Sequence, residues 1–216
     1  MNPKFSDRRE AGRRLARHLA EYGDRDDVVV LGLPRGGVPV AYEVALALHA
    51  PLDVLPVRKL GVPGREELAF GAIAAGGVRV LNPDVISEAR LRQAAIARIT
   101  ADERFELDRR EVLYRGGRPA IDAAGRTALA VDDGLATGAT MRAAVAALRA
   151  RGAASVVVAV PVAAPPTCVE LARRADAVIC ALTPEPFVAV GLWYSDFSPT
   201  TDDEVRGLLA RTREPG

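Results

Sequence analysis

Two adjacent carboxylates end an apolar run and are followed at once by a loop of small and hydroxyl-bearing residues. The segment 128–141 reads Ala-Leu-Ala-Val-Asp-Asp-Gly-Leu-Ala-Thr-Gly-Ala-Thr-Met. Its apolar first part predicts a buried strand, and the residues after the loop predict the start of a helix. In open α/β sheets, ligands bind at the edge where such a strand ends. This loop is therefore the first candidate for a binding site.

The composition of this loop suits a phosphate next to a diol. Glycines let backbone amides approach a ligand closely, threonine hydroxyls add donors, and a helix start presents N–H groups with partial positive charge. The ionised Asp132 and Asp133 only accept hydrogen bonds, so they repel a second phosphate but pair with two hydroxyls. A phosphate beside a diol describes a ribose 5-phosphate. The alternative is that both aspartates only cap the strand and turn. The candidate binding residues here are Asp132, Asp133, Gly134, Leu135, Ala136, Thr137, Gly138, Ala139 and Thr140.

A second turn that could bind a ligand consists of Arg35, Gly36 and Gly37 and follows the apolar run 28–33. It places a guanidinium and two accessible backbone amides at the same sheet edge, an arrangement that suits a diphosphate. The alternative is a tight strand-to-helix turn in which Arg35 is only solvated.

A third segment begins with the basic pair Arg58 and Lys59 after the apolar run 52–57. Glycines and prolines up to Gly71 would let a loop close over a site and exclude water. A basic pair after a strand is otherwise ordinary surface.

The elements that must position these turns alternate between β-branched runs and alanine-rich helical stretches. That alternation predicts an α/β fold with a doubly wound, mostly parallel sheet flanked by helices. The segment 58–77 is rich in glycine and proline and predicts an extended hairpin or a mobile loop. The predicted strands are 28–33, 52–57, 127–131, 155–160 and 177–182. The predicted helices are 8–22, 38–48, 87–114, 141–150, 167–173 and a last one that a capping box opens at Thr201.

Composition limits the classes of protein and partner. The 216 residues, 49% of them hydrophobic and 26% charged, predict one globular domain, with a core of about 27–183 and a hood of about 1–26 and 184–216. A formal net charge of +1 excludes a global field that would attract nucleic acid or an anionic membrane. The arginine-rich face of segment 8–17 is diluted by acids and predicts a solvated helix face rather than a nucleic-acid site.

The sequence also bears on compartment and metals. No apolar stretch is long enough to span a membrane, and the first residues show no secretory signal, so we expect a cytoplasmic protein. Cys168 and Cys180 form no CxxC pair, and with only His18 and His49 they make no zinc set. We expect both thiols in apolar surroundings. A homodimer is left open as the assembly.

The run from Asp132 to Thr140 resembles the phosphoribosyl diphosphate (PRPP) binding motif of type I phosphoribosyltransferases, most closely that of the adenine enzymes. The resemblance implies that both aspartates bind the ribose hydroxyls and that residues 136–140 wrap the 5-phosphate. It also implies Mg²⁺ that arrives with PRPP, held mainly through the substrate, with the two aspartates contacting it through water. Several members carry an acid where this chain has Ala136, so a general base is absent at that position.

The other two turns also resemble members of this family. Arg35, Gly36 and Gly37 match its pyrophosphate loop, which commonly holds a non-proline cis peptide. Arg58 and Lys59 match the start of the flexible loop and would face the leaving pyrophosphate. The acid that purine enzymes carry farther along this loop is replaced by Ala74 or Ala75, and Glu66 and Glu67 are the nearest carboxylates.

The segment 182–191 resembles the base-pocket segment of hypoxanthine-guanine enzymes, where Phe187 would stack on a planar ring. Trp193, Tyr194 and Phe197 either extend that wall or pin the tail to the core. The base-reading lysine of those enzymes is absent from 161–164, so the acceptor is left open beyond a nitrogen nucleophile, with a purine-like base as one candidate.

The whole pattern predicts transfer of ribosyl 5-phosphate from PRPP to a small-molecule nitrogen acceptor, with release of pyrophosphate. The catalytic candidates are Asp132, Asp133, Arg35, Arg58 and Lys59. The alternative is a regulator that binds PRPP or a nucleotide without catalysis, which the missing acids at Ala74 and Ala136 favour.

Overall fold

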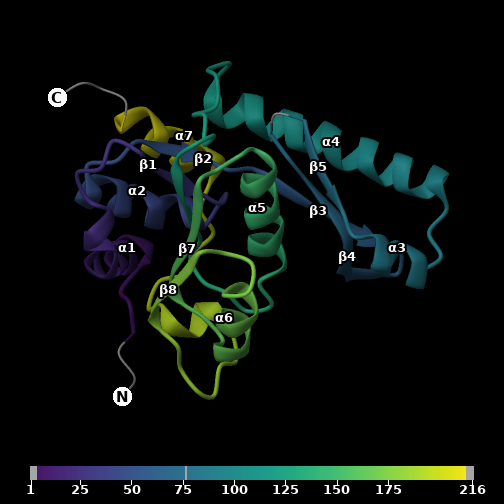
Figure 1. Cartoon of the computed structure of the whole chain (residues 1–216). Helices are drawn as coiled ribbons and strands as arrows, with labels where there is room; N and C mark the ends of the chain where they lie inside the picture. Colours follow the sequence, from purple (N-terminus) through teal and green to yellow (C-terminus); the bar gives the residue numbers. More distant parts are fainter. Residues whose placement is uncertain (1–3, 76, 213–216) are drawn as a thin grey trace.

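The computed structural model describes residues 4–75 and 77–212, with the side chains of Glu66 and Glu67 left out. Five parallel strands form the central sheet in the order β2-β1-β6-β7-β8 (Figure 1). The chain runs from β1 outward to β2, returns to β6 beside β1, and then winds outward to β8. The predicted doubly wound parallel sheet is confirmed, with its switch of direction between β1 and β6. The strands are β1 (Val28–Gly32), β2 (Leu52–Val54), β6 (Thr127–Val131), β7 (Ser155–Val162) and β8 (Ala177–Leu182).

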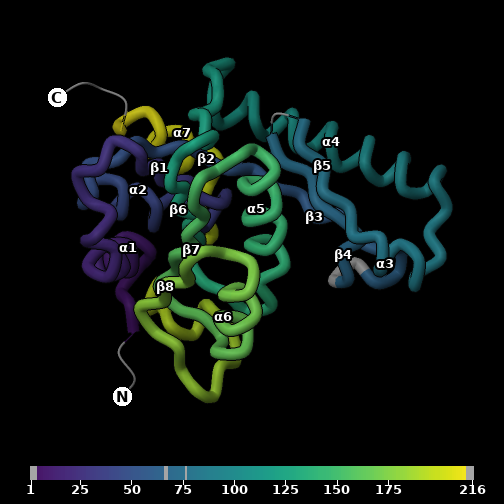
Figure 2. The backbone as a smooth tube through the Cα atoms, viewed as in Figure 1, coloured from purple at the N-terminus to yellow at the C-terminus, as the bar shows by residue number. Residues whose placement is uncertain are grey.

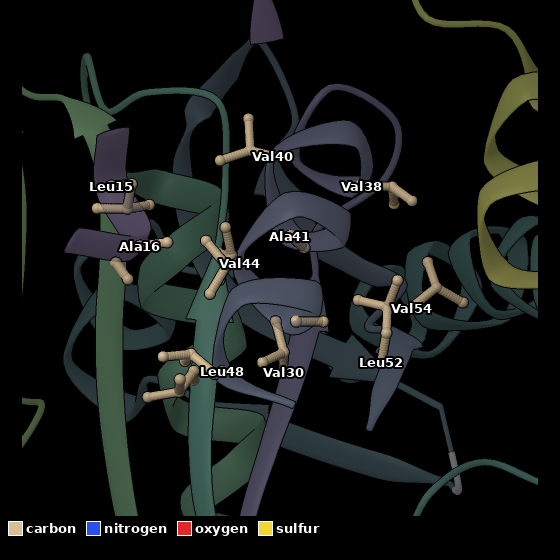
Figure 3. Packing of buried hydrophobic residues seen from close by; sticks show 14 of the residues in the cluster. Leu15, Ala16, Val30, Val38, Val40, Ala41, Val44, Leu48, Leu52 and Val54 are labelled. Carbon is tan, nitrogen blue, oxygen red and sulfur yellow. The ribbon is translucent and has the colours of Figure 1, made fainter. Parts of the chain in front are cut away.

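Helices cover both faces of this sheet, because successive strand side chains point to opposite faces. Val28 and Val30 of β1 join a buried cluster with α1 (Arg8–Ala16), α2 (Gly37–Leu48) and α7 (Asp202–Arg211), part of which Figure 3 shows. Val29 and Leu31 join the opposite cluster with α5 (Ala139–Ala150) and α6 (Pro165–Leu171). The result is a three-layer core that fixes the strand ends where the candidate loops begin.

The segment predicted as a hairpin or loop is a separate antiparallel sheet of β3 (Val57–Val62), β4 (Arg65–Ala74) and β5 (Val78–Leu81). It packs with α3 (Pro83–Glu88) and α4 (Gln93–Arg115) around a small cluster that includes Leu60, Phe70 and Leu107. We call β3–β5 together with α3 and α4 the wing. Figure 2 shows the wing extending to one side of the parallel sheet. The hairpin alternative is thus the correct one.

Each of three predicted elements is divided in two in the structure, and the predicted helix 167–173 lies two residues earlier, as α6. The strand 52–57 is split, because Pro56 has no N–H to donate and the chain leaves the sheet there for β3. The helix 87–114 is two helices: Asn82 caps α3 through the Asp84 and Val85 amides, and a break with Arg90 at φ 51° precedes α4. The helix 8–22 ends as a 3₁₀ helix, η1 (Arg17–Tyr22).

The N-terminal segment meets residues 193–196, which follow β8. The Phe5 N–H donates to the Trp193 carbonyl at 2.8 Å, and the Asp196 N–H donates to the Ser6 carbonyl at 2.8 Å. Trp193 ends the short 3₁₀ helix η2 (Val190–Trp193). None of the described helices is both long enough and apolar enough to cross a bilayer.

Candidate active site

The loop between β6 and α5 forms a hollow with a volume of ≈ 190 Å³. Gly138, with φ +68°, turns the chain into α5, which begins at Ala139 rather than at the predicted residue 141. At Gly134 a Cβ would lie 2.5 Å from Val190 Cγ1, so a larger residue does not fit there. The lining consists of the acid and loop residues already proposed together with two others: Asp132, Gly134, Leu135, Ala136, Thr137, Gly138, Ala139, Thr140, Met141 and Val190.

Neighbouring segments hold the loop in place. The Leu135 N–H donates to the Val162 carbonyl at 2.9 Å, and the Ala164 N–H donates to the Leu135 carbonyl at 2.9 Å. The buried Thr167 of α6 donates through Oγ1 to the Ala136 carbonyl at 2.6 Å. These bonds use the N–H of Leu135 and the carbonyls of Leu135 and Ala136, and they hold the loop in place for binding through the N–H groups and hydroxyls of residues 136–140.

Asp132 lines this hollow directly after the end of β6, and Asp133 follows it in the chain. The Asp133 N–H donates to Asp132 Oδ1 at 2.9 Å, which orients the first carboxylate. Burial, followed by the nearby charge of Asp133, raises the pKa of Asp132 well above its usual value of 3.8. Burial also raises the pKa of Asp133, while Arg8 acts in the opposite direction. Burying these two carboxylates in their ionised form costs free energy, which a partner of opposite charge or a hydrogen-bond donor must offset.

Arg8 is the partner of Asp133, and sequence reasoning missed it. Its Nε donates to Asp133 Oδ2 at 2.8 Å, its Nη1 donates to the Ser198 carbonyl at 2.8 Å, and its guanidinium lies 4.0 Å from the Phe197 ring centroid. Tyr194 donates its hydroxyl proton to the Asp133 carbonyl at 2.6 Å. Nothing in the sequence separates Arg8 from the other arginines of its helix, since the contact spans 125 positions.

The turn of Arg35, Gly36 and Gly37 packs directly against the acid pair. A Cβ at Gly36 would overlap Asp133 Oδ2, and one at Gly37 would lie 2.8 Å from Asp132 Cα. The Pro34–Arg35 peptide is cis, as the family resemblance implies. Arg35 itself is half-exposed, with Nη1 3.9 Å from Asp202 Oδ1 of α7. Both glycines are therefore needed for the turn to reach the carboxylates.

Arg58 and Lys59 lie on β3 and share a second hollow, of ≈ 380 Å³, with Thr140 of the phosphate loop. Arg58 Nε donates to Glu103 Oε2 of α4 at 2.5 Å. The structure thus brings the basic pair to the end of the phosphate loop. The side chains of Glu66 and Glu67 lie outside the described residues.

Phe187 is not among the described residues that line these two hollows. It is partly buried against a cluster that includes Phe5, Trp193 and Tyr194. The tail aromatics thus pin the tail to the core, and Phe197 also supports Arg8. The site residues that sequence reasoning missed are Arg8, Thr167, Val190 and Tyr194.

The donor set at the strand end fits a magnesium ion that is shared with a phosphate ligand. Mg²⁺ prefers oxygen, keeps several waters and is usually held by one or two carboxylates together with substrate phosphates. Asp132 and Asp133 supply such carboxylates. Within residues 4–75 and 77–212, no group of three or more His, Cys, Asp or Glu residues could hold a metal by itself.

A parallel sheet with a phosphate-type loop at its switch of direction defines a nucleotide- or sugar-phosphate-binding class. The chain belongs to the phosphoribosyl transferase domain family, whose sequence pattern matches residues 6–188.

Among its relatives, "Putative phosphoribosyl transferase Rv0571c" of Mycobacterium tuberculosis is 53% identical over 207 residues, which is 96% of this chain and 46% of that protein. The chain thus spans about half the length of that relative. TT1426 from Thermus thermophilus, which has a crystal structure, is 45% identical in sequence to this chain. The two structures align with a TM-score of 0.88 over 96% of this chain and 98% of that one. The AQ2163 protein of Aquifex aeolicus, 12% identical with a TM-score of 0.51 over 85% of this chain and 78% of that one, shares the fold.

Proposed function

We propose that this protein transfers the 5-phosphoribosyl group of PRPP to a nitrogen acceptor and releases pyrophosphate, in a Mg²⁺-dependent reaction. The observation that carries the proposal is the hollow between β6 and α5, which combines a phosphate-type loop with an adjoining pair of carboxylates. This pairing suits the phosphate and the diol of one ribose 5-phosphate better than it suits two phosphates.

The loop and the acid pair would fix the sugar. The N–H groups of 136–140 and the hydroxyls of Thr137 and Thr140 bind the 5-phosphate at the start of α5, where the helix end favours negative charge. Asp132 and Asp133 accept hydrogen bonds from the two ribose hydroxyls. Holding both ends of the ribose sets the orientation of its anomeric carbon, and this positioning is a large part of the rate enhancement.

The leaving pyrophosphate would lie between the two basic turns. The amide of Gly36 and the guanidinium of Arg35 would face it from the turn after β1, where the Gly37 N–H already donates to the Leu33 carbonyl at 3.0 Å. Arg58 and Lys59 would face it from β3. When bound, Mg²⁺ supplies positive charge that stabilises the departing pyrophosphate. The carboxylates favour the positive charge that develops on the ribose ring as the bond to pyrophosphate breaks.

The acceptor is a small molecule with a nucleophilic nitrogen, and a purine-like base stays one candidate. Phe187 is proposed as the ring that stacks on a planar acceptor, which requires the tail to move from its packing against Phe5 and Trp193. We also propose a cytoplasmic location, one domain with its core at about 27–183, and no nucleic-acid or membrane partner. The homodimer stays an open alternative to a single chain.

The direct test measures PRPP binding by calorimetry in the presence of Mg²⁺, and pyrophosphate release with a panel of bases and amines. Asp133→Asn should weaken PRPP binding by about 1.5–3 kcal/mol, the scale of a hydrogen bond to a charged group. Asp27→Asn, which changes an exposed aspartate, serves as the matched control. Absence of PRPP binding in the wild-type protein would refute the proposal.

The same measurements separate the enzyme from the regulator. Binding without pyrophosphate release for any acceptor would favour a non-catalytic PRPP sensor. One structural feature favours that alternative: Ala136 supplies no general base on the exposed side of the phosphate loop.

A further inference from the structure

The sulfur atoms of Cys168 and Cys180 lie 3.1 Å apart, although the residues are 12 positions apart in the chain. Cys168 is on α6 and Cys180 is on β8, the edge strand of the parallel sheet that α6 covers. Both are free thiols and both are partly exposed, so a small oxidant can reach them. We propose that these two cysteines form a reversible disulfide that braces the phosphate loop.

Little movement separates the two thiols from a bond. A disulfide has a sulfur–sulfur distance of about 2.05 Å, so closure requires a displacement of about 1 Å that two side chains share. The elements that carry them are already in contact, since Cys168 and Cys180 pack on the same buried cluster as Leu135, Ala163 and Leu171. The bond can therefore form without repacking α6 or β8.

The oxidation is balanced with a peroxide as oxidant. One thiol, as its thiolate, attacks hydrogen peroxide to give a sulfenic acid and hydroxide, and the second thiol condenses with it to give the disulfide and water. Two thiols and one peroxide thus give one disulfide and two waters. Burial, followed by the hydrogen bond to Cys168, raises the pKa of the Cys180 thiol, which disfavours its thiolate form. A dithiol reductant reverses the reaction.

The disulfide would act on the phosphate loop through Thr167, the residue next to Cys168. Thr167 donates to the Ala136 carbonyl at 2.6 Å, and its methyl is the atom that a Cβ at Gly138 would meet at 2.7 Å. Fixing Cys168 to β8 limits the motion of α6, and so keeps Thr167 against the loop. We expect the oxidised protein to open this loop less often than the reduced protein does.

The first experiment asks whether the bond forms. The reduced full-length protein is treated with hydrogen peroxide, alkylated and digested, and its peptides are analysed by mass spectrometry. The expected product is a crosslinked pair of peptides containing Cys168 and Cys180, restored to free thiols by dithiothreitol. Cys168→Ser and Cys180→Ser should each abolish it. Separate sulfinic acids on the two cysteines, or crosslinks only between chains, would overturn the proposal.

The second experiment asks whether the bond acts on the loop. Amide hydrogen exchange of residues 134–140 is compared in the reduced and oxidised proteins, without any ligand. Exchange should slow by about five-fold on oxidation, the effect of stabilising one hydrogen bond. Thr167→Val should still form the disulfide but lose the slowing. Equal exchange in the reduced and oxidised wild-type proteins would overturn the coupling between the disulfide and the loop.

These measurements do not use PRPP, so their outcome is independent of the proposed transferase function. The melting temperature gives a further check. A disulfide over this span should raise it by roughly 6 °C or more in the oxidised wild-type protein and leave both serine variants unchanged by peroxide.

Discussion

Arg8 of the first helix and Asp133 at the end of β6 form an ion pair, with Arg8 Nε 2.8 Å from Asp133 Oδ2 and both side chains largely shielded from solvent. The pair joins the N-terminal segment to the acid pair that we propose as the diol site. It also balances two opposing effects on one carboxyl, since burial raises the pKa of Asp133 and Arg8 lowers it. The protonation state of the candidate site thus depends on a residue far from it in sequence.

Replacing Arg8 should shift the pH dependence of PRPP binding. Arg8→Gln removes the charge that favours ionised Asp133, so its already raised pKa rises further. Because the diol needs the ionised carboxylate, binding in the variant should be lost at a higher pH as the solution is acidified. Calorimetric titrations with PRPP from about pH 8 down to about pH 5 measure the shift.

Arg14→Gln is the matched control for this change. Arg14 lies on the same helix and over the Phe5 ring, 4.7 Å from its centroid, but it forms its ion pair with Glu10. Its pH profile should follow that of the wild-type protein. Superimposable profiles for Arg8→Gln and Arg14→Gln would contradict the role given to Arg8.

Asp132→Asn should stabilise the folded protein near neutral pH. The pKa of Asp132 is raised in the folded state, so the folded protein binds its proton more tightly than the unfolded chain does. The contribution of Asp132 to stability is therefore most favourable below its ordinary pKa of 3.8 and is lost as the pH rises through the folded value. An amide keeps the acceptor for the Asp133 N–H without the buried charge.

The gain should be present at pH 7 and fall toward zero at about pH 3, where the carboxyl is largely protonated in both the folded and the unfolded protein. Urea unfolding at both pH values measures it. Asp133→Asn provides the comparison, because it also breaks the Arg8 pair and should gain less. A variant that is less stable than the wild-type protein at neutral pH and unchanged in acid would show that Asp132 is not strained by burial.

The parallel sheet could be predicted because each of its strands has a local sequence pattern typical of a buried strand. The runs at 28–33, 127–131 and 155–160 are β-branched and apolar, and each is followed by a turn and a helical stretch. The division of 52–57 and of 87–114 could not be predicted with the same ease, because apolar periodicity continues across both breaks. The signals that were present, Pro56 and the Asn82–Pro83 helix start, are single residues whose effect depends on where the chain must go next.

The residues of the candidate site also differ in how readily the sequence predicts them. The phosphate loop and acid pair are contiguous, so their chemistry is visible in one stretch of sequence. Arg8, Thr167 and Val190 reach that stretch from three other elements, through contacts that only the packed fold creates. Sequence reasoning therefore finds the residues that touch the proposed ligand more readily than those that hold them in position.

Gly36→Ala should destabilise the protein and weaken PRPP binding, although φ at Gly36 is −60° and an alanine can adopt it. The added Cβ would overlap Asp133 Oδ2 and lie 3.2 Å from Arg8 Nε, so the ion pair must move. We expect a loss of about 1–3 kcal/mol, as for other overpacked sites. Denaturant unfolding and PRPP calorimetry measure the two effects.

Gly207→Ala is the matched control, because no atom lies within 4 Å of its added Cβ and it sits in the α7 helix. It should stabilise the protein by about 0.5–1 kcal/mol, the usual gain of alanine over glycine in a helix. If Gly36→Ala behaved as Gly207→Ala does, the turn would not be in contact with the acid pair.

The buried pair of Asp53 and Arg115 should be the strongest single link between the wing and the parallel sheet. Arg115 ends α4 and donates through Nε to Asp53 Oδ2 of β2 at 3.2 Å and through Nη2 to the Val54 carbonyl at 2.8 Å. Asp53→Ala leaves the buried guanidinium with Glu111 as its remaining carboxylate partner on the same helix. The expected loss is about 3 kcal/mol or more in urea unfolding.

The double variant Asp53→Ala with Arg115→Met should recover part of that loss, because it removes the uncompensated charge and keeps an apolar side chain in its place. Arg25→Gln is the exposed comparison: Arg25 and Asp27 are paired at 2.8 Å but are 42% and 49% exposed, so the change should cost less than about 1 kcal/mol. A similar small cost for Asp53→Ala would mean that the wing is held mainly by its apolar contacts, with the ion pair contributing little.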